Sequence, residues 1–455
     1  MKASQATILI IIGVTGDLSV RKLLPAISQM AAAGALPDHF RILGITRRPD
    51  IKVDSLFTKT KKTAYLREHI QLFAMDLTAD EDYEKLKAEL SKIEDELGQP
   101  AQRLFYLAVP PQVSRPIIER LGVSGLAALG QAKLLLEKPF GVDLGSAAEL
   151  VQYIGQYFQA DQIYRIDHYL ARETAQNIII FRKNNALFKK TWNRDFISRL
   201  EIVATEEIGI EGRAVFYEQT GALRDLVQSH LLQLAALALM DISSDDKTEE
   251  IPIRRLAALR QLHFPEGAPA TDYARRGQYE GYQAEAKNIG SSVETFVSLS
   301  LESDDPKWRG VPITLTTGKA LDRKFTGIII SYRQEKEDEA NQLTLHLQPD
   351  EGVELCLFAK RPGYDHAVSR HPLKFAFQEY YANLPDAYEQ VLFNAFNSDH
   401  SLFTTSDEVL ETWRILDAVQ RAWEMDSEDL IIYKPGSTKE EILAAAAPSA
   451  AIKEK

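Results

Sequence analysis

TILIIIGVTGDL, residues 7–18, combines a strand, a glycine-containing turn and the start of a helix. The run Thr7–Ile12 is continuous, apolar and β-branched, which is typical of a strand that is covered on both faces of a parallel sheet. Gly13 and Gly16 follow it directly, and helical periodicity then extends across Leu23–Ala33. A strand, a glycine turn and a helix in this order predict the start of a doubly wound α/β domain.

The alternation of strands and helices continues through the first third of the chain. Further strands are predicted at Arg41–Ile45, Gln71–Met75, Arg103–Ala108 and Lys133–Leu136. Helices are predicted between them, at Val53–His69, Asp80–Leu97 and Val113–Leu121. Strands and helices that alternate at this spacing favour a parallel, doubly wound sheet of the Rossmann type.

After about residue 185 the pattern changes, because longer strands follow one another without helices between them. These strands are predicted at Leu200–Val203, Val293–Leu299, Ile313–Thr317, Gly327–Tyr332 and Asn341–Leu347, with helices at Leu223–Met240 and Ser406–Met425 and a loop at Ser243–Glu250. Such a pattern indicates an α+β domain with a large, mainly antiparallel sheet. We therefore predict a Rossmann domain over residues 1–170, an α+β domain over 171–440 and a flexible tail over 441–455.

The composition excludes several classes of protein. The 455 residues include 65 Asp and Glu against 53 Lys and Arg, a formal charge of −12 that argues against nucleic acid as a partner. A single cysteine, Cys356, excludes a disulfide framework, a cysteine zinc cluster and an iron–sulfur cluster, and we predict that it lies in the core. No stretch approaches ~20 apolar residues, so no membrane span is predicted. No metal site is predicted either. A polar start without a signal peptide predicts a cytoplasmic location.

The turn after the first strand is a candidate phosphate loop. It comprises Gly13, Val14, Thr15, Gly16, Asp17 and Leu18, and Ser19 stands where the longer dinucleotide pattern has a third glycine. Glycines let the backbone approach a pyrophosphate, and the helix N-terminus supplies amide donors. Alone, the pattern could be an ordinary strand–helix turn, but its place after the first buried strand favours cofactor binding.

The end of the second strand indicates which dinucleotide binds. Dinucleotide folds that select NAD usually carry an acid there, whereas this chain has Arg47 and Arg48. A guanidinium can bind the additional 2′-phosphate of NADP with two parallel hydrogen bonds. The alternative is a pair of solvated arginines, but the missing acid favours NADP.

Three further segments carry reactive side chains. They are EKPFG from Glu137, RIDHYL from Arg165, and the stretch from Glu206 to Gln233, which ends in QSHLLQ. Taken singly, each has an ordinary structural explanation: a loop lysine at Lys138, a structural histidine at His168, and a core histidine at His230. Together they place acids, imidazoles and a phenol around predicted element ends, where ligands bind in α/β folds.

With these segments the sequence resembles the glucose-6-phosphate dehydrogenase family. The matching blocks are GVTGDLSVRKLLPA from Gly13, LAVPP from Leu107, EKPFG, RIDHYL, EGRAVFYEQTGALRDLVQSHLLQL from Glu211, RGQY from Arg276, ETF from Glu294, KWRGVPITLTTGKAL from Lys307, PDAYE from Pro385, SLFTTSDEV from Ser401 with the WRI that follows, and YKPGS from Tyr433. They cover roughly residues 7–437 in the order of the family.

The resemblance implies oxidation of β-D-glucose 6-phosphate at C1 to 6-phosphoglucono-1,5-lactone with hydride transfer to NADP+, the first step of the oxidative pentose phosphate pathway. It implies His230 as the general base and Asp167 as its partner, roles that suit an imidazole near neutral pH. Substrate-binding positions implied by the motifs are Lys138, His168, Tyr169, Arg172, Glu206, Asp225, Lys319 and Arg323. Implied cofactor positions are Gly13 to Leu18, Arg47, Asp76, Leu77, Val109, Pro110 and Lys138. The family also implies a homodimer or homotetramer.

Some residues depart from the family pattern. Ala171 and Arg172 stand for Gly and Lys, Ser229 for Asn before the base, Ala214-Val215 for a Gly pair, and Thr316 for an arginine before TGK. Arg keeps the charge of Lys but is longer and planar, so the substitution bears on phosphate affinity. Two alternatives remain at this point: a related NADP-dependent sugar oxidoreductase, or a catalytically weak NADP-binding regulatory homologue.

Overall fold

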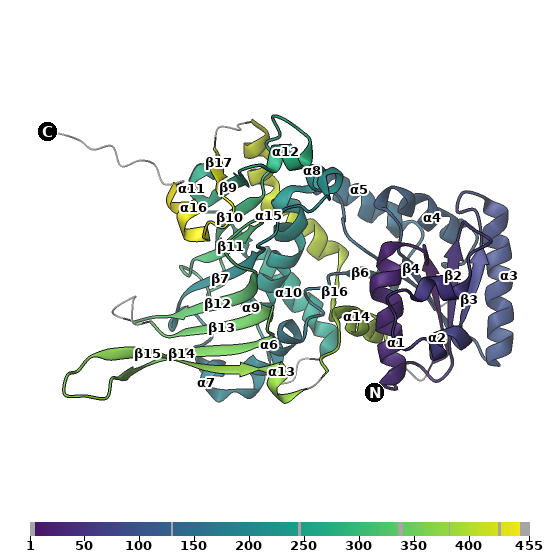
Figure 1. The fold of residues 1–455 in the computed structure, drawn as a ribbon, viewed down its shortest axis with the longest axis horizontal. Coiled ribbons are helices and arrows are strands. Elements are labelled where there is room, and N and C mark those ends of the chain that lie inside the picture. Colours follow the sequence, from purple (N-terminus) through teal and green to yellow (C-terminus); the bar gives the residue numbers. More distant parts are fainter. Residues whose placement is uncertain are drawn as a thin grey trace. The chain divides into compact units, whose positions relative to one another are not determined.

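The computed structural model describes residues 5–128, 131–243, 247–334, 340–381, 383–425 and 429–445. By its internal contacts the chain forms two compact units. The first unit comprises Met1–Arg172, Asp246–Ile253 and Pro385–Leu410, and the second comprises Glu173–Asp245, Arg254–Leu384 and Glu411–Lys455. Figure 1 shows both as ribbons, and each is described by itself.

The sheet of the first unit has the strand order β16-β6-β5-β4-β1-β2-β3. Its strands are β1 (Thr7–Ile12), β2 (Phe40–Thr46), β3 (Ile70–Ala74), β4 (Gln102–Leu107), β5 (Ala132–Leu136), β6 (Ile163–Ile166) and β16 (Phe403–Thr404). The first six pair in parallel, and β16 alone joins antiparallel, at the edge. The order reverses beside β1, which creates the switch point where such sheets bind dinucleotides. This arrangement confirms the predicted Rossmann fold.

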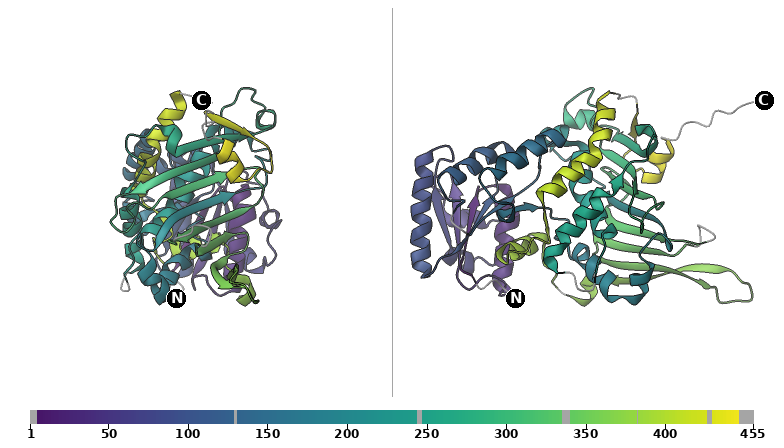
Figure 2. Two further views of the ribbon diagram at one scale, coloured as in Figure 1. Left: turned by 90° about the vertical axis from the view of Figure 1, so that its left-hand side faces the viewer. Right: turned by 180° about the vertical axis from the view of Figure 1, so that it is seen from behind.

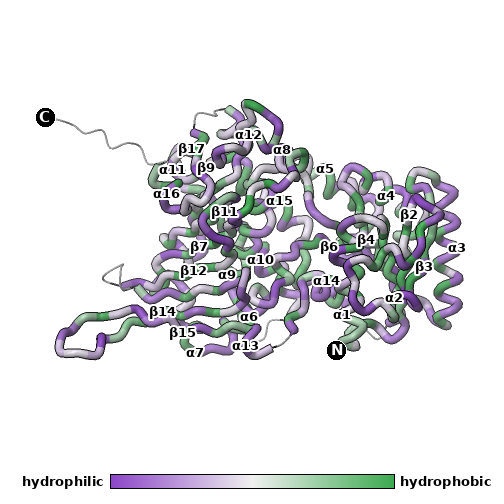
Figure 3. Tube along the Cα trace, viewed as in Figure 1, coloured by the Kyte–Doolittle hydropathy of each residue, from purple (hydrophilic) through white to green (hydrophobic). Residues whose placement is uncertain are grey.

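Helices flank this sheet (Figure 1). They are α1 (Leu24–Ala32), α2 (Ala64–His69), α3 (Asp80–Leu97), α4 (Pro111–Val123), α5 (Leu144–Gly155) and α14 (Ala387–Phe396), together with a π-helical turn, η1 (Ser19–Leu23), before α1. Figure 3 shows mainly hydrophilic colour along α3, because most of its residues are charged or polar; its buried residues are Tyr83, Leu86, Leu90 and Ile93. No described helix combines the length and hydropathy that a membrane span requires.

One predicted helix of the first unit was wrong. Val53–His69 is not continuous, because a short 3-10 helix, η2 (Val53–Phe57), and α2 are separated by residues 58–63. That segment reads TKTKKT, so three lysines repel one another and three β-branched threonines disfavour a helix.

The second unit is built on a mixed, mostly antiparallel sheet. Its strand order is β15-β14-β13-β12-β7-β11-β10-β9-β17, and β8 (Leu262–His263) pairs with β10 outside this path. Only β7–β11 and β9–β17 pair in parallel among the described strands. The strands are β7 (Ile197–Thr205), β9 (Ala274–Tyr279), β10 (Phe296–Ser303), β11 (Ile313–Gly318), β12 (Phe325–Tyr332), β13 (Gln342–Gln348), β14 (Gly352–Lys360), β15 (Val368–Ala376) and β17 (Leu430–Tyr433). The predicted α+β architecture is confirmed.

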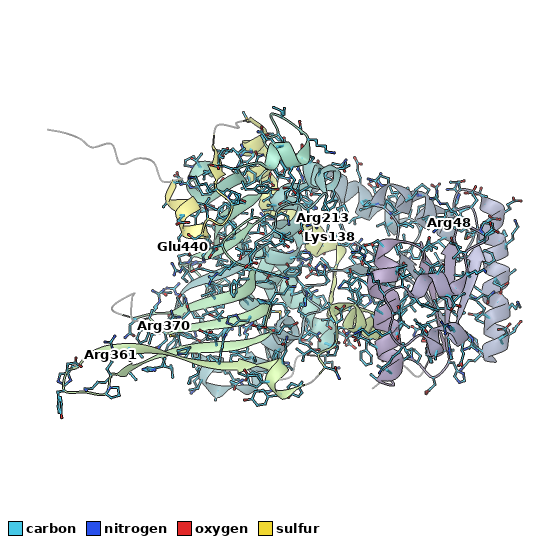
Figure 4. All side chains as sticks on the ribbon, viewed as in Figure 1. Arg48, Lys138, Arg213, Arg361, Arg370 and Glu440 are labelled. Atoms are coloured by element: carbon cyan, nitrogen blue, oxygen red, sulfur yellow. The ribbon has the colours of Figure 1, made fainter. Side chains whose placement is uncertain are left out.

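Helices cover one face of this sheet, as the left view of Figure 2 shows. They include α6 (Glu173–Asn184), α7 (Ala186–Thr191), α8 (Ala214–Ala222), α9 (Leu232–Leu239), α10 (Ile251–Arg260) and α15 (Ser406–Met425). All eight residues of α9 are buried, which places it in the centre of the core. Cys356 is buried in β14, as predicted. Arg361 and Arg370, labelled in Figure 4, mark the hairpin that β14 and β15 form.

Four predictions for the second half of the chain differ from the structure. The predicted helix Leu223–Met240 begins as a π-helix, η4 (Leu223–Leu231), before α9 continues it. The predicted strand Val293–Leu299 starts only at Phe296, because the preceding residues bind other backbone segments. In the predicted loop Ser243–Glu250, residues 248–250 form a 3-10 turn, whereas 244–246 lie outside the described residues. Of the predicted tail, residues 441–445 belong to α16 (Lys439–Ala445), and 446–455 lie outside the described residues.

Candidate active site

The loop between β1 and the following helix is closed around Gly13. This glycine has φ +95°, and a Cβ on it would lie 2.5 Å from the Ala108 carbonyl oxygen. The loop is held by hydrogen bonds from the Gly13 and Val14 amides to Ile45 O, both 3.2 Å, and from the Gly16 amide to Gly13 O, 2.9 Å. A side chain at Gly13 would therefore disrupt the switch point itself. The loop conformation therefore requires glycine at position 13.

Ser19 takes the place of the third glycine without opening the loop. It is fully buried, and its hydroxyl donates to Gly13 O at 3.0 Å. The helical turn begins at Asp17, so the first amides of the helix lie directly after Gly16. Such amides and the positive end of the helix dipole suit a phosphate group. The loop thus has the shape and the donors that a pyrophosphate requires.

Arg47 and Arg48 are both exposed and follow the carboxyl end of β2 (Figure 4 labels Arg48). The Arg48 amide donates to the Thr46 hydroxyl at 3.1 Å, which fixes the turn. Asp76, one of the predicted cofactor residues, accepts from the Thr78 amide and hydroxyl at 2.9 and 2.7 Å. These two bonds lower the pKa of Asp76, and the charge of Arg47 lowers it further. The two arginines and Asp76 therefore stand at neighbouring strand ends.

The other two predicted cofactor turns also lie at carboxyl ends of strands. Leu77 follows β3, and its carbonyl accepts from the Tyr83 hydroxyl at 3.0 Å. Val109 and Pro110 follow β4, and Val109 reaches the loop, since its Cγ1 lies 3.0 Å from the position of a Cβ on Gly13. All predicted cofactor residues except Lys138 therefore lie at the carboxyl ends of the parallel strands β1 to β4.

Lys138 directly follows Glu137, a half-buried carboxyl group at the end of β5. Glu137 accepts a hydrogen bond from the Tyr106 hydroxyl at 2.5 Å, and the hydroxyl of Tyr388 also bonds to it. Burial raises the pKa of Glu137 to about 7, although the two phenols and the Lys138 charge oppose the shift. The sequence motif contained Glu137 but gave it no role. Tyr388 comes from the distant PDAYE block, so only the structure reveals this cluster.

Glu137 predicts a specific dependence of stability on pH. Its pKa is about 7 in the folded chain against an ordinary value of 4.5, so folding takes up a proton between these values. The contribution of Glu137 to stability therefore falls as pH rises through this window, by a total of about 3 kcal/mol. Glu137→Gln should lose this dependence, so its unfolding midpoint relative to wild type should rise from pH 5 to pH 8. Glu302→Gln, at an exposed site, is the control, and parallel pH curves for all three proteins would contradict the prediction.

Asp167 to Arg172 form a compact turn after β6, still within the first unit. Asp167 is 2% exposed, and one of its carboxylate oxygens accepts from the Tyr169 amide at 2.9 Å. The Asp167 carbonyl accepts from the Leu170 amide at 3.1 Å, and the Tyr169 carbonyl from the Arg172 amide at 3.2 Å. The rings of His168 and Tyr169 meet edge to face at 5.1 Å. This turn brings together an acid, an imidazole, a phenol and a guanidinium, at the strand-to-helix junction that the sequence predicted.

His230 lies on the π-helix Leu223–Leu231 of the second unit and is 1% exposed. Asp225, five residues earlier, lies on the same helix and is half-buried. π-helical segments are rare and occur frequently at functional sites. The helix therefore holds the predicted base in the interior of the unit.

Lys319 and Glu206 form an ion pair at the ends of β11 and β7, in which Lys319 is buried and Glu206 is half-buried. The Lys319 side chain is 5% exposed, and its Nζ pairs with Glu206 Oε2 and also lies 5.3 Å from the centre of the Tyr217 ring. Burial raises the pKa of Tyr217, and the charges of Asp225 and Glu206 act in the same direction. Lys319 thus lies beside Tyr217, and the charges of two other predicted substrate residues act on its hydroxyl. Tyr217 lies within the GRAVFYEQTG stretch but was not predicted to have a role.

Arg323 lies in the segment between β11 and β12, four residues after Lys319. It is exposed, and its guanidinium lies over the Phe325 ring at 5.4 Å. The loop before it is tied to the YKPGS block, through hydrogen bonds of Gly436 N to Ala320 O, 2.8 Å, and Asp322 N to Ser437 O, 3.1 Å.

Both parts of the chain match models of one protein family. Residues 10–177 match the NAD-binding domain of glucose-6-phosphate dehydrogenase, and residues 179–449 match its C-terminal domain. The chain belongs to the glucose-6-phosphate dehydrogenase family. It is 34% identical to glucose-6-phosphate 1-dehydrogenase of Bacillus subtilis, over 96% of each chain. It is 33% identical to that of Chlamydia muridarum, over 93% of this chain and 91% of the relative.

Solved structures of glucose-6-phosphate dehydrogenases have the same fold. A glucose-6-phosphate dehydrogenase in complex with its substrate glucose 6-phosphate has a TM-score of 0.90 at 28% identity, over 99% of both chains. The enzyme from Mycobacterium avium has a TM-score of 0.80 at 30% identity, over 95% of both. Gal80p of Saccharomyces cerevisiae, a super-repressor mutant, reaches a TM-score of 0.55 over 92% of this chain and 97% of its own. Its identity of 11% indicates a shared fold alone.

Proposed function

We propose that this chain oxidises β-D-glucose 6-phosphate at C1 to 6-phosphoglucono-1,5-lactone and transfers the hydride to NADP+. The proposal rests on membership of the glucose-6-phosphate dehydrogenase family over nearly the whole chain. The single structural observation that carries it is the buried His230 on the π-helix that also bears Asp225, in the unit where Glu206 and Lys319 pair beside Tyr217. A general base and a set of groups able to bind sugar hydroxyls are what oxidation of a hexose phosphate requires.

The first unit fits an NADP molecule. The cradle at Gly13 excludes a side chain, the helix from Asp17 offers its first amides, and Arg47 is exposed at the end of β2. We propose that Gly13 to Leu18 hold the pyrophosphate, that Arg47 binds the 2′-phosphate, and that Asp76, Leu77, Val109, Pro110 and Lys138 complete the site. When bound, NADP+ supplies the hydride acceptor.

His230 acts as the general base in this proposal. The C1 hydroxyl proton passes to the imidazole while the C1–H bond breaks with its electron pair, and the C1–O bond becomes the lactone carbonyl. A histidine suits this step because its pKa lies near neutral pH, so it can accept and later release the proton.

Asp167 acts as the partner of the base, as the family resemblance implies. A carboxylate that accepts from an imidazole N–H holds the ring in one orientation and stabilises the positive charge that the proton brings. Asp167 belongs to the first unit and His230 to the second, so this pairing is proposed from the motifs. The Tyr169 amide already fixes one oxygen of Asp167.

The remaining predicted residues bind the substrate. His168, Tyr169 and Arg172 offer a set of donors on one turn for the phosphate dianion, and the guanidinium of Arg172 can form two parallel bonds to it. Glu206, Asp225 and Lys319 would hydrogen-bond sugar hydroxyls, and Lys138 would contact both the sugar and the cofactor. Arg323 is proposed from the resemblance alone, because the structure places it over Phe325.

A direct assay tests the proposed function. Purified protein with glucose 6-phosphate should reduce NADP+ faster than NAD+, and unphosphorylated glucose should be a far poorer substrate. No reduction of either cofactor would refute the proposal. Faster oxidation of a different phosphosugar would indicate a related sugar oxidoreductase, and tight NADP+ binding without turnover would indicate a regulatory homologue. The cytoplasmic location, the absence of a nucleic-acid partner and the homodimeric or homotetrameric state stay predictions from the sequence.

A further inference from the structure

The chain bends sharply at Gly221, directly before the helix that carries His230. Gly221 has φ +61° and ψ −179°, a conformation that is essentially restricted to glycine. α8 ends at this bend, and the π-helix Leu223–Leu231 begins two residues later. The direction of that helix, and with it the position of Asp225 and His230, therefore depends on what holds the bend.

Glu294 holds the bend with both its side chain and its main chain. Its Oε1 accepts from the Leu223 amide at 2.9 Å, and its carbonyl accepts from the Ala222 amide at 3.0 Å. A Cβ on Gly221 would lie 2.3 Å from the same Oε1, so the carboxylate packs directly against the glycine. Glu294 is 9% exposed, and no residue of the helix itself caps this end through its side chain. One residue thus satisfies the first amides of the helix.

The next residue, Thr295, fixes the backbone of Lys319. Its carbonyl accepts from the Lys319 amide at 2.9 Å. Its hydroxyl shares a 2.8 Å hydrogen bond with the Tyr433 hydroxyl, which in turn donates to the Lys319 carbonyl at 2.7 Å. The two adjacent residues Glu294 and Thr295 therefore connect the start of the His230 helix to the residue that pairs with Glu206.

We propose that Glu294 is a positioning residue: it sets the direction of the Leu223–Leu231 helix against the Lys319 backbone, so that His230 and Asp225 meet the sugar that Lys319 and Glu206 bind. This inference rests on the proposed function, because it assigns Glu294 a role through His230. The Glu294 side chain accepts from the Leu223 amide, so its proposed action on His230 passes through the main chain of the helix.

The chemistry of the site favours an acceptor, and a carboxylate in particular. A negative group at a helix N-terminus interacts favourably with the helix dipole. Burial raises the pKa of Glu294, whereas the Leu223 amide and the charges of Arg224 and Arg276 act in the opposite direction. Glutamine would keep an acceptor oxygen at the same reach but lose the charge. Alanine would leave the Leu223 amide without its partner.

These differences define the experiment. Glu294→Ala should lower kcat for glucose 6-phosphate oxidation about 10- to 100-fold, because a displacement of reacting groups near 1 Å has costs of this size. The KM for NADP+ should stay within about 2-fold, since the proposed cofactor residues lie in the other unit. Glu294→Gln should recover kcat to within about 5-fold of wild type. Glu302→Ala, at an exposed position of β10, is the matched control and should equal wild type.

Two outcomes would overturn the inference. One is a Glu294→Ala protein that is less stable but turns over at the wild-type rate; the other is a Glu294→Gln protein that is as slow as Glu294→Ala. If Glu294→Ala does not fold, Glu294→Asp takes its place. The aspartate side chain is one methylene shorter, so its carboxylate cannot reach the Leu223 amide in the same way. A wild-type kcat in Glu294→Asp would also overturn the inference. The activity of the wild-type protein, measured in the same series, tests the proposed function separately. If Glu294 has no positioning role, the wild-type protein still oxidises glucose 6-phosphate.

Discussion

His230→Asn is expected to lower kcat for glucose 6-phosphate oxidation by about 10²- to 10⁴-fold, the range over which a general base contributes. Asparagine keeps a polar side chain of similar reach but cannot accept the C1 hydroxyl proton at neutral pH. The KM for glucose 6-phosphate should change little, because the phosphate is assigned to His168, Tyr169 and Arg172. Steady-state kinetics with varied glucose 6-phosphate and saturating NADP+ measure both quantities.

The matched control for this variant is His346→Asn. His346 lies in β13 of the same unit, is half-buried, and has Glu354 at 3.6 Å and the Phe325 ring as neighbours. It has no place in the proposed site, so kcat should stay near the wild-type value. A His230→Asn enzyme with near-normal kcat would remove His230 from the role of base, and an equal loss in both variants would indicate a general structural effect.

Arg47→Ala is expected to raise the Kd of NADP+ about 10- to 100-fold and to leave the Kd of NAD+ within about 2-fold. Hydrogen bonds to a charged group contribute about 1.5–3 kcal/mol, and NAD+ lacks the 2′-phosphate that would accept them. Isothermal titration of each cofactor against the variant and the wild type gives the two ratios directly.

Arg67→Ala is the control for the loss of one exposed arginine of the first unit. Arg67 pairs with Asp54 at 2.8 Å and has no predicted role in cofactor binding. This variant tests whether the loss of one positive charge from the first unit is enough to weaken the binding of NADP+. An equal rise in the Kd of NADP+ and of NAD+ in Arg47→Ala would contradict the assignment of the 2′-phosphate to this residue.

Most of the fold could be predicted because its strands have strong local patterns. β1 is a run of six buried residues, and β2 and β4, which flank it in the first unit, are also mostly buried, so the sequence indicates that these segments are strands. The segment Val53–His69 could not be predicted as it is, since its apolar spacing resembles a helix while its centre, TKTKKT, disfavours one. The late start of β10 likewise depends on Glu294 and Thr295, whose partners are distant in sequence.

Sequence motifs located the groups that carry the proposed chemistry, but not their neighbours. The loop at Gly13 and the Asp167–Arg172 turn are local features, so adjacent residues suffice to predict them. Glu137 illustrates the limit, because its two phenol partners, Tyr106 and Tyr388, come from β4 and from α14, and Tyr388 is distant from Glu137 in sequence. Tyr217 and Glu294 are similar, since their importance arises from contacts with residues of other elements. Long-range packing of this kind has no signature in a single sequence.

The balance of charge also becomes clear from these placements. The net charge of −12 is unfavourable for a protein that we propose binds two phosphorylated molecules. The cationic residues assigned to them, Arg47, Lys138, Arg172 and Lys319, are few and local. Acidic residues elsewhere, such as Asp80, Glu81 and Asp82 at the start of α3, account for part of the excess. Binding thus depends on local charge and not on the sum over the chain.

Glucose 6-phosphate with deuterium at C1 tests the central claim most directly. If the chain transfers hydride from C1 to NADP+, mass spectrometry should find the deuterium in the reduced cofactor, and the lactone product should have lost it. The rate should also fall relative to unlabelled substrate wherever hydride transfer limits turnover. Reduced cofactor without deuterium, or no reduction at all, would contradict the account.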